Sequence, residues 1–226
     1  MQKTFSFQAL EEWEQNIFNN IYNDYYFSRH ESFWRQQAVW KLPALLDATQ
    51  MLICGEDLGM IPASVPGVMA DLNIIPLEIQ RMPKGDTKYG LPAGYPYLSV
   101  CSPSCHDMST IRGWWENDAA NANQFHQEFL GMDGPAPQKC SSSIVENINQ
   151  VHLNAPSILA IFPIQDLLGM DDKLKKPDAI SEQINEPSNP DHYWRYRLHI
   201  DLEDLLNEHS FLNKIKHMVI ASGRVI

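Results

Sequence analysis

Three features are missing from this sequence, and each absence narrows the class of protein. No run rich in lysine and arginine occurs, and the 226 residues carry a net charge of −11. Nucleic acid is therefore not an expected partner, because neutralising phosphates requires clustered cations. No apolar stretch approaches the ~20 residues that span a bilayer, and the first residues lack the apolar core of a signal peptide. We expect a cytoplasmic protein without a membrane segment.

Cysteine is also scarce, with four residues in the chain. Cys54, Cys101, Cys105 and Cys140 are not spaced like a small disulfide framework, which favours reduced thiols. Cys101, Cys105, Cys140 and His106 could supply zinc ligands, but the Cys-x3-Cys-His spacing is tight and Cys140 is remote. The simpler interpretation places Cys54 and Cys101 on buried strands as small apolar residues. We expect no metal and no cofactor.

The sequence does contain an alternation of strand and helix patterns, with 44% hydrophobic residues. Short apolar runs predict strands at 51–54, 77–80, 97–100 and 157–162, and segments with helical periodicity separate them. Such alternation implies parallel strands with crossover helices. A closed (β/α)8 barrel needs eight strands, so four strands predict either a small open α/β sheet or half of a barrel.

We expect one domain over residues 1–226, divided into three segments. An aromatic-rich lead-in covers 1–30, strand–helix units cover 31–166, and a polar loop with C-terminal helices covers 167–226.

Acidic residues follow two of the predicted strands. Glu56 and Asp57 come directly after the first, and a short loop leads from the third to His106 and Asp107. Parallel α/β folds place their sites at these strand ends. Carboxylates beside aromatic side chains suit glycosidic-bond chemistry, in which an acid protonates the leaving oxygen and flat rings stack on sugars. Two plainer interpretations stay open: Asp57 caps a turn, and His106 with Asp107 is a hydrogen-bonded loop pair.

Other candidate residues also have two interpretations. Trp114 and Trp115 are adjacent, so on a helix they point about 100° apart and at most one faces a cleft. Gln165 and Asp166 lie at the end of the fourth strand, which favours a site role, although Asp166 could cap the following turn. Trp194 either lines a sugar site or clamps the late loop.

Several ordered segments form a recognisable set: 55–62, 78–83, 104–116, 164–169, 184–187 and 194–195. Together they resemble the amylomaltase family of 4-α-glucanotransferases, glycoside hydrolase family 77. The resemblance extends from about residue 20 to residue 224. Two details, Gln-Arg-Met-Pro and Trp-Trp-Glu, resemble the branch related to the plant cytosolic disproportionating enzyme.

The resemblance implies the C-terminal half of a (β/α)8 barrel and a retaining transfer of α-1,4-glucan segments between maltooligosaccharides. Glu56 would be the general acid/base. Asp107 would stabilise the oxocarbenium-like transition state and grip sugar hydroxyls, while His106 would hydrogen-bond the same ring. The expected substrate-binding residues are His106, Asp57, Trp114, Gln165, Asn185 and Trp194.

One part of the family pattern is not found in these 226 residues. The family's nucleophile is an aspartate in an Arg-x-Asp-His-type segment, and nothing before Glu56 fits that segment. A retaining mechanism requires a nucleophile roughly 5 Å from the acid, so we expect this polypeptide alone not to turn over. Two alternatives are a non-catalytic glucan-binding piece and a half-barrel that self-associates through exposed sheet edges.

Overall fold

The computed structural model describes residues 1–224, which form two compact units. The division falls between Pro76 and Leu77, inside strand β2 (Ile75–Ile79). Neither limit predicted from the sequence, at residue 30 or at residue 166, coincides with it.

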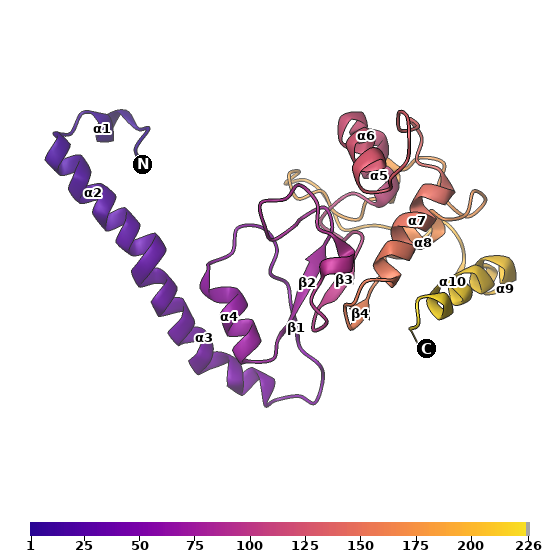
Figure 1. Cartoon of the computed structure of the whole chain (residues 1–226), viewed down its shortest axis with the longest axis horizontal. Coiled ribbons are helices and arrows are strands. Elements are labelled where there is room, and N and C mark those ends of the chain that lie inside the picture. Colours follow the sequence, from indigo (N-terminus) through magenta and orange to yellow (C-terminus); the bar gives the residue numbers. More distant parts are fainter. Residues whose placement is uncertain (225–226) are drawn as a thin grey trace. The chain divides into compact units, whose positions relative to one another are not determined.

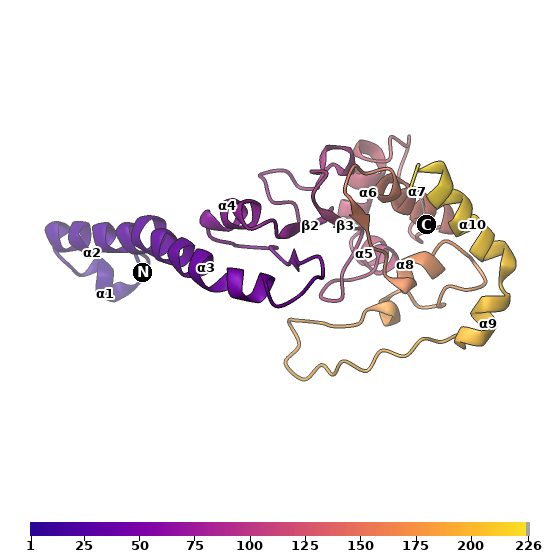
Figure 2. The same cartoon turned by 90° about the horizontal axis from the view of Figure 1, so that it is seen from below.

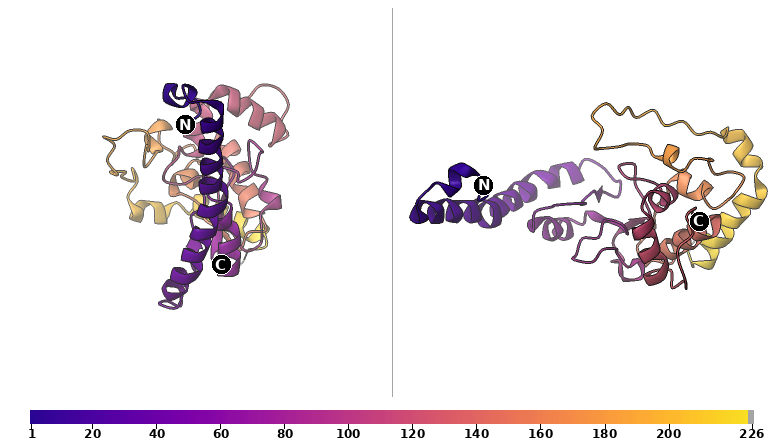
Figure 3. Two further views of the ribbon diagram at one scale, coloured as in Figure 1. Left: turned by 90° about the vertical axis from the view of Figure 1, so that its left-hand side faces the viewer. Right: turned by 90° about the horizontal axis from the view of Figure 1, so that it is seen from above.

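A long helical segment dominates the first unit (Figures 1 and 3). The π-helical turn η1 (Tyr25–Arg29) connects α2 to α3 without a break, so the aromatic-rich residues before 30 belong largely to a helix. No residue of α2 or α3 is buried. The unit contains α1 (Phe5–Gln8), α2 (Glu12–Asp24), α3 (His30–Leu46), β1 (Cys54–Gly55) and α4 (Ser64–Asp71).

The second unit packs helices around the rest of the sheet. Its strands are the end of β2 with β3 (Val100–Ser102) and β4 (Leu159–Ala160). Its helices are α5 (Ile111–Asn117), α6 (Ala119–Glu128), α7 (Ser142–Leu153), α8 (Ile164–Leu168), α9 (Leu202–Asn207) and α10 (His209–Ala221), with 3-10 turns η2 (Pro92–Gly94) and η3 (Ile180–Glu182). Figure 2 shows the long connection from α8 to α9, in which η3 is the only helical turn described.

The strands are all parallel, in the order β1-β2-β3-β4. This confirms the predicted α/β class with four parallel strands. The third strand begins at Val100 rather than at Tyr97, because Tyr97 and Leu98 are exposed in the loop before it. Cys101 is fully buried as predicted, but Cys54 is exposed, and the prediction of a buried position was wrong. The reason is that β1 lies at one end of the strand order and pairs with β2 alone.

The core of the second unit lies between α5, α6, α7, α8 and α10. Trp115, Phe125 and Phe211 are among its largest buried side chains. The hydroxyl of Thr110 accepts a hydrogen bond from the Gly113 N–H at 3.1 Å and so caps α5. This core fixes the carboxyl ends of β3 and β4, from which the candidate site is built.

Candidate functional site

Glu56 and Asp57 follow β1 in the first unit. A side chain at Gly55 would come within 2.8 Å of the Met69 methyl, so glycine lets the strand end lie close against α4. Glu56 is exposed, and its Oε1 accepts a hydrogen bond from the Leu58 N–H at 3.2 Å. Asp57 is buried. The acid expected to perform chemistry thus reaches solvent, and its neighbour points into the protein.

The segment after Glu56 is anchored at its far end by α3. The Glu31 carboxylate accepts hydrogen bonds from the backbone N–H groups of Ala63, at 3.1 Å, and Ser64, at 2.8 Å. These contacts, chiefly those with Ser64, lower the pKa of Glu31. Gly59 adopts a φ of +75°, a conformation that glycine reaches without strain. Residues 56–63 therefore form a defined turn between β1 and α4.

His106 and Asp107 lie in the loop after β3 in the second unit, and residues almost eighty positions later hold them. The Asn185 side-chain amide donates to Asp107 Oδ1 at 2.7 Å, and the Asn185 backbone N–H donates to the His106 carbonyl. His106 Nε2 lies 3.4 Å from Asp107 Oδ2. The Trp194 ring is centred 5.1 Å from the His106 ring and is 61% exposed. Four predicted site residues thus form one accessible cluster, the His106 cluster (His106, Asp107, Asn185, Trp194).

A cavity of about 470 Å³ lies at the carboxyl ends of β2, β3 and β4. Its walls are largely apolar, with His106, Gln165 and Glu182 among its polar lining. Gln165 is buried, and its side-chain amide donates to the Glu182 carbonyl at 3.3 Å. Gln165 therefore reaches the strand-end region that the sequence predicted for it.

Trp114 occupies a different environment from the one expected of a sugar platform. Its ring packs against Tyr89 and Phe125 at centroid distances of 5.9 and 5.3 Å, and the Arg81 guanidinium lies over it at 5.4 Å. It does not line the strand-end cavity. Trp115 is 1% exposed and donates to the Pro137 carbonyl. Both tryptophans thus belong to the packing between α5 and α6.

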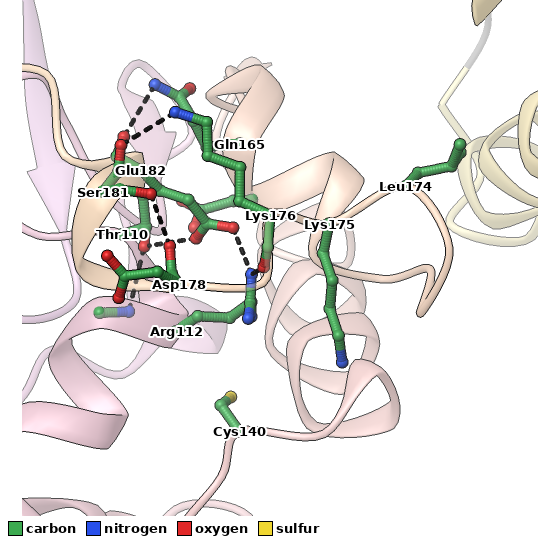
Figure 4. Close-up of polar contacts among 12 residues, drawn as sticks. Thr110, Arg112, Cys140, Gln165, Leu174, Lys175, Lys176, Asp178, Ser181 and Glu182 are labelled. Carbon is green, nitrogen blue, oxygen red and sulfur yellow. Dashed lines mark hydrogen bonds and ion pairs between the residues drawn. The ribbon is translucent and has the colours of Figure 1, made fainter. Parts of the chain in front are cut away.

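A buried polar frame surrounds the site, and its members escaped the sequence prediction. Arg112 pairs with Glu182, which also accepts a hydrogen bond from the Thr110 hydroxyl at 3.1 Å (Figure 4). Arg112 donates as well to the Lys176 carbonyl at 2.9 Å. Through these contacts α5 holds η3, three residues before Asn185. No spacing in the sequence links Arg112 to a glutamate seventy positions away.

Burial governs the protonation of this frame. Burial raises the pKa of Glu182, and the nearby Arg112 opposes that rise. Burial likewise raises the pKa of Asp166, against hydrogen bonds from Ser104 and Ile111. Burial lowers the pKa of Arg81 to about 10. Burial disfavours the charged form of a carboxylate, and the donors and cations in contact with it offset that cost only while they stay in place.

Among residues 1–224, no three His, Cys, Asp or Glu side chains gather closely enough to hold a metal ion. No helix in that part of the chain is long and apolar enough to cross a bilayer.

Parallel strands that gather His, Asp, Asn and an exposed Trp beside a strand-end cavity are typical of α/β proteins that bind polar ring-shaped ligands such as sugars. The profile that describes 4-alpha-glucanotransferases matches residues 4–203. The chain belongs to the 4-alpha-glucanotransferase family.

Individual proteins of known sequence that resemble this chain carry the same family name. The chain is 48% identical over 222 residues to the 4-alpha-glucanotransferase DPE2 of Oryza sativa subsp. japonica, covering 98% of this chain and 24% of the rice protein. It is 34% identical over 178 residues to the 4-alpha-glucanotransferase of Chlamydia muridarum, covering 77% of this chain and 33% of that protein. The chain thus spans about a quarter of the rice protein and about a third of the Chlamydia protein.

The fold also resembles a solved structure. The amylomaltase of Streptococcus agalactiae, determined in complex with acarbose, matches with a TM-score of 0.59 and 20% identity. The match covers 77% of this chain and 32% of that structure. It supports the α/β fold and an open sheet that corresponds to part of a barrel.

Proposed function

We propose that this chain supplies the general acid/base and the sugar-gripping carboxylate for a retaining transfer of α-1,4-glucan segments between maltooligosaccharides. The observation that carries the proposal is the His106 cluster, in which Asn185 fixes Asp107 beside an accessible imidazole and an exposed indole. These groups can receive one sugar ring.

The geometry gives each member a task. Asn185 occupies one oxygen of Asp107, which orients the carboxylate while about half of its surface stays accessible to sugar hydroxyls. A carboxylate held in this way stabilises positive charge that develops on the sugar ring, because its orientation is fixed before the reaction begins. Trp194 offers an exposed ring face for stacking. Gln165 contributes to the cavity next to His106.

The roles of Glu56 and Asp57 rest on the family. Glu56, exposed after β1, would protonate the leaving oxygen. Asp57, buried next to it in the chain, would help to form the sugar site. The nucleophile has no counterpart in the 226 residues, because no Arg-x-Asp-His segment occurs in them. We place the protein in the cytoplasm, as its four cysteines, which are not spaced like a disulfide framework, and the family branch suggest.

Replacing Asp107 with alanine tests the grip on sugar. We expect the apparent affinity for maltoheptaose, followed by tryptophan fluorescence, to fall about 10- to 100-fold, because hydrogen bonds to a charged group are lost. Asp191→Ala is the matched control, since it removes an exposed carboxylate three residues from Trp194. Equal binding by the Asp107 variant and the wild type would remove Asp107 from the site.

The second expectation concerns turnover. When the 226-residue polypeptide alone is incubated with maltotriose, we expect no longer or shorter oligosaccharides, because a retaining reaction requires a nucleophile next to the acid. Chromatography of the products measures this. Clear disproportionation would show that another carboxylate of this chain acts as the nucleophile.

The two alternatives give other outcomes. Saturable binding without any transfer, even in longer forms of the protein, would indicate a glucan-binding piece. Self-association is favoured by β4, which among the described strands pairs with β3 alone and borders an apolar cavity of about 390 Å³. Light scattering that shows only a monomer would remove the reason for that alternative.

A further inference from the structure

The loop that carries His106 and Asp107 is attached at both ends to one buried carboxylate. The Ser104 hydroxyl donates to Asp166 Oδ2, and the Ile111 backbone N–H donates to Asp166 Oδ1 at 2.8 Å. These donors lie just before His106 and at the start of α5, so the two oxygens of Asp166 bridge the base of the loop.

A partly buried cation holds the same loop along its length. The Arg81 guanidinium donates to the Ser109 carbonyl at 2.6 Å and to the Pro103 carbonyl at 3.4 Å. Arg81 and Asp166 also attract each other electrostatically. The loop thus folds over a buried carboxylate and a partly buried guanidinium.

Asp166 itself does not reach a ligand. Its side chain is 1% exposed, and it is not among the residues that line the strand-end cavity. It is fixed in turn by α7, because the Asn149 side-chain amide donates to the Asp166 carbonyl at 2.9 Å. A direct role in binding sugar is therefore excluded by its position in this structure.

We propose that Asp166 is a positioning residue for Asp107 and His106: by closing the loop 104–111 at both ends it sets the orientation in which these side chains meet a glucan. The expected effect on glucan binding rests on the proposed function, whereas the contacts that hold the loop do not depend on it. Two oxygens serving two ends of one loop constrain its shape, whereas a turn cap satisfies its own helix alone.

The experiment compares Asp166→Ala with Asp166→Asn by hydrogen exchange and by maltoheptaose titration. Alanine removes both acceptors. Asparagine keeps an oxygen for the Ile111 N–H and an amide that can donate to the Ser104 hydroxyl. Asp171→Ala is the matched control, because Asp171 is an aspartate just after α8 whose Oδ1 accepts hydrogen bonds only from nearby backbone groups, those of Lys173 and Leu174.

We expect backbone amides of residues 104–111 to exchange about tenfold faster in Asp166→Ala, with a similar loss of glucan affinity. Asp166→Asn restores most of both, and amides in α6 and α10 stay unchanged. Loop exchange equal to that of the wild type, or a loosened loop with full affinity, would overturn the proposal.

A third variant covers the case in which Asp166→Ala does not fold. Ser104→Ala removes one donor to Asp166 and leaves the buried carboxylate in place. We expect faster exchange confined to residues 104–111, and unchanged exchange there would contradict the proposal. If the wild type does not bind maltoheptaose at all, the proposed function fails, while the exchange data still decide whether Asp166 holds the loop.

Discussion

Replacing Arg112 with methionine should lower the free energy of unfolding of the second unit by about 3–5 kcal/mol, because it leaves the Glu182 carboxylate buried without its countercharge. Both side chains are almost wholly withdrawn from solvent, at 3% and 2% exposure. The substitution also removes the donor to the Lys176 carbonyl, so that the chain before η3 loses a second attachment. Urea unfolding followed by circular dichroism measures the change.

Two further variants test whether the loss of stability in Arg112→Met comes from leaving a buried charge unpaired. Lys139→Met breaks the Lys139–Glu116 pair, whose lysine is largely exposed, and should cost no more than about 1 kcal/mol. Combining Arg112→Met with Glu182→Leu should recover part of the stability, because no unpaired charge then stays buried. A loss for Arg112→Met no larger than that for Lys139→Met would show that the pair is not the buried clamp described here.

The same variant has a defined pH dependence. Burial raises the pKa of Glu182, and without Arg112 its main opposing cause is lost, leaving the weaker hydrogen bond from Thr110. A carboxyl group whose pKa is higher in the folded state destabilises the protein increasingly as pH rises through that value. The deficit of Arg112→Met relative to the wild type should therefore shrink as the pH is lowered from neutral.

Trp115→Ala and Trp194→Ala should separate folding from sugar binding. Trp115 is 1% exposed within the core, so its removal should cost about 3–5 kcal/mol. Trp194 is 61% exposed, and its removal should change stability by no more than about 0.5 kcal/mol. Glucan binding should respond in the opposite order, because only Trp194 lies beside His106.

Urea unfolding and isothermal titration with maltoheptaose, both insensitive to the loss of an indole fluorophore, measure the two effects. Unchanged glucan affinity in Trp194→Ala would exclude Trp194 from the site. A small stability loss in Trp115→Ala would mean that the packing between α5 and α6 tolerates the cavity.

Local patterns predicted the class of fold because they act over short distances. Alternating apolar runs and helical periodicity predicted four parallel strands, and the structure contains them. The observed limits of the strands differ from the predicted ones where burial depends on neighbouring segments of the chain. Tyr97 and Leu98 look like strand residues but are exposed, and Cys54 is exposed because β1 ends the strand order.

The candidate site was predictable only in part, because its contacts join distant segments. Resemblance to a family indicated His106, Asp107, Asn185 and Trp194, and the structure brings these four together. It could not indicate that Trp114 packs in the core. That environment is created by Tyr89 and Phe125, which approach from other elements.

The sequence singled out Asp166 at a strand end, but it gave no signal of the contacts that make up the supporting frame. Asp166 holds residues 104 and 111, and Glu182 reaches Arg112 across seventy positions. Buried polar pairs of this kind follow no period along the chain, since their partners are chosen by the packed core.

The side-chain amide of Asn185 offers the most direct test of the site. Its NMR signals, assigned by their loss in Asn185→Asp, can be followed while maltoheptaose is added. The exposed amide of Gln150, which donates to Asn154 at 2.9 Å on α7, serves as the internal control. The expected result is a saturable shift of the Asn185 amide with no change at Gln150. An Asn185 amide that stays unmoved at saturating glucan would contradict a sugar site at Asp107 and His106.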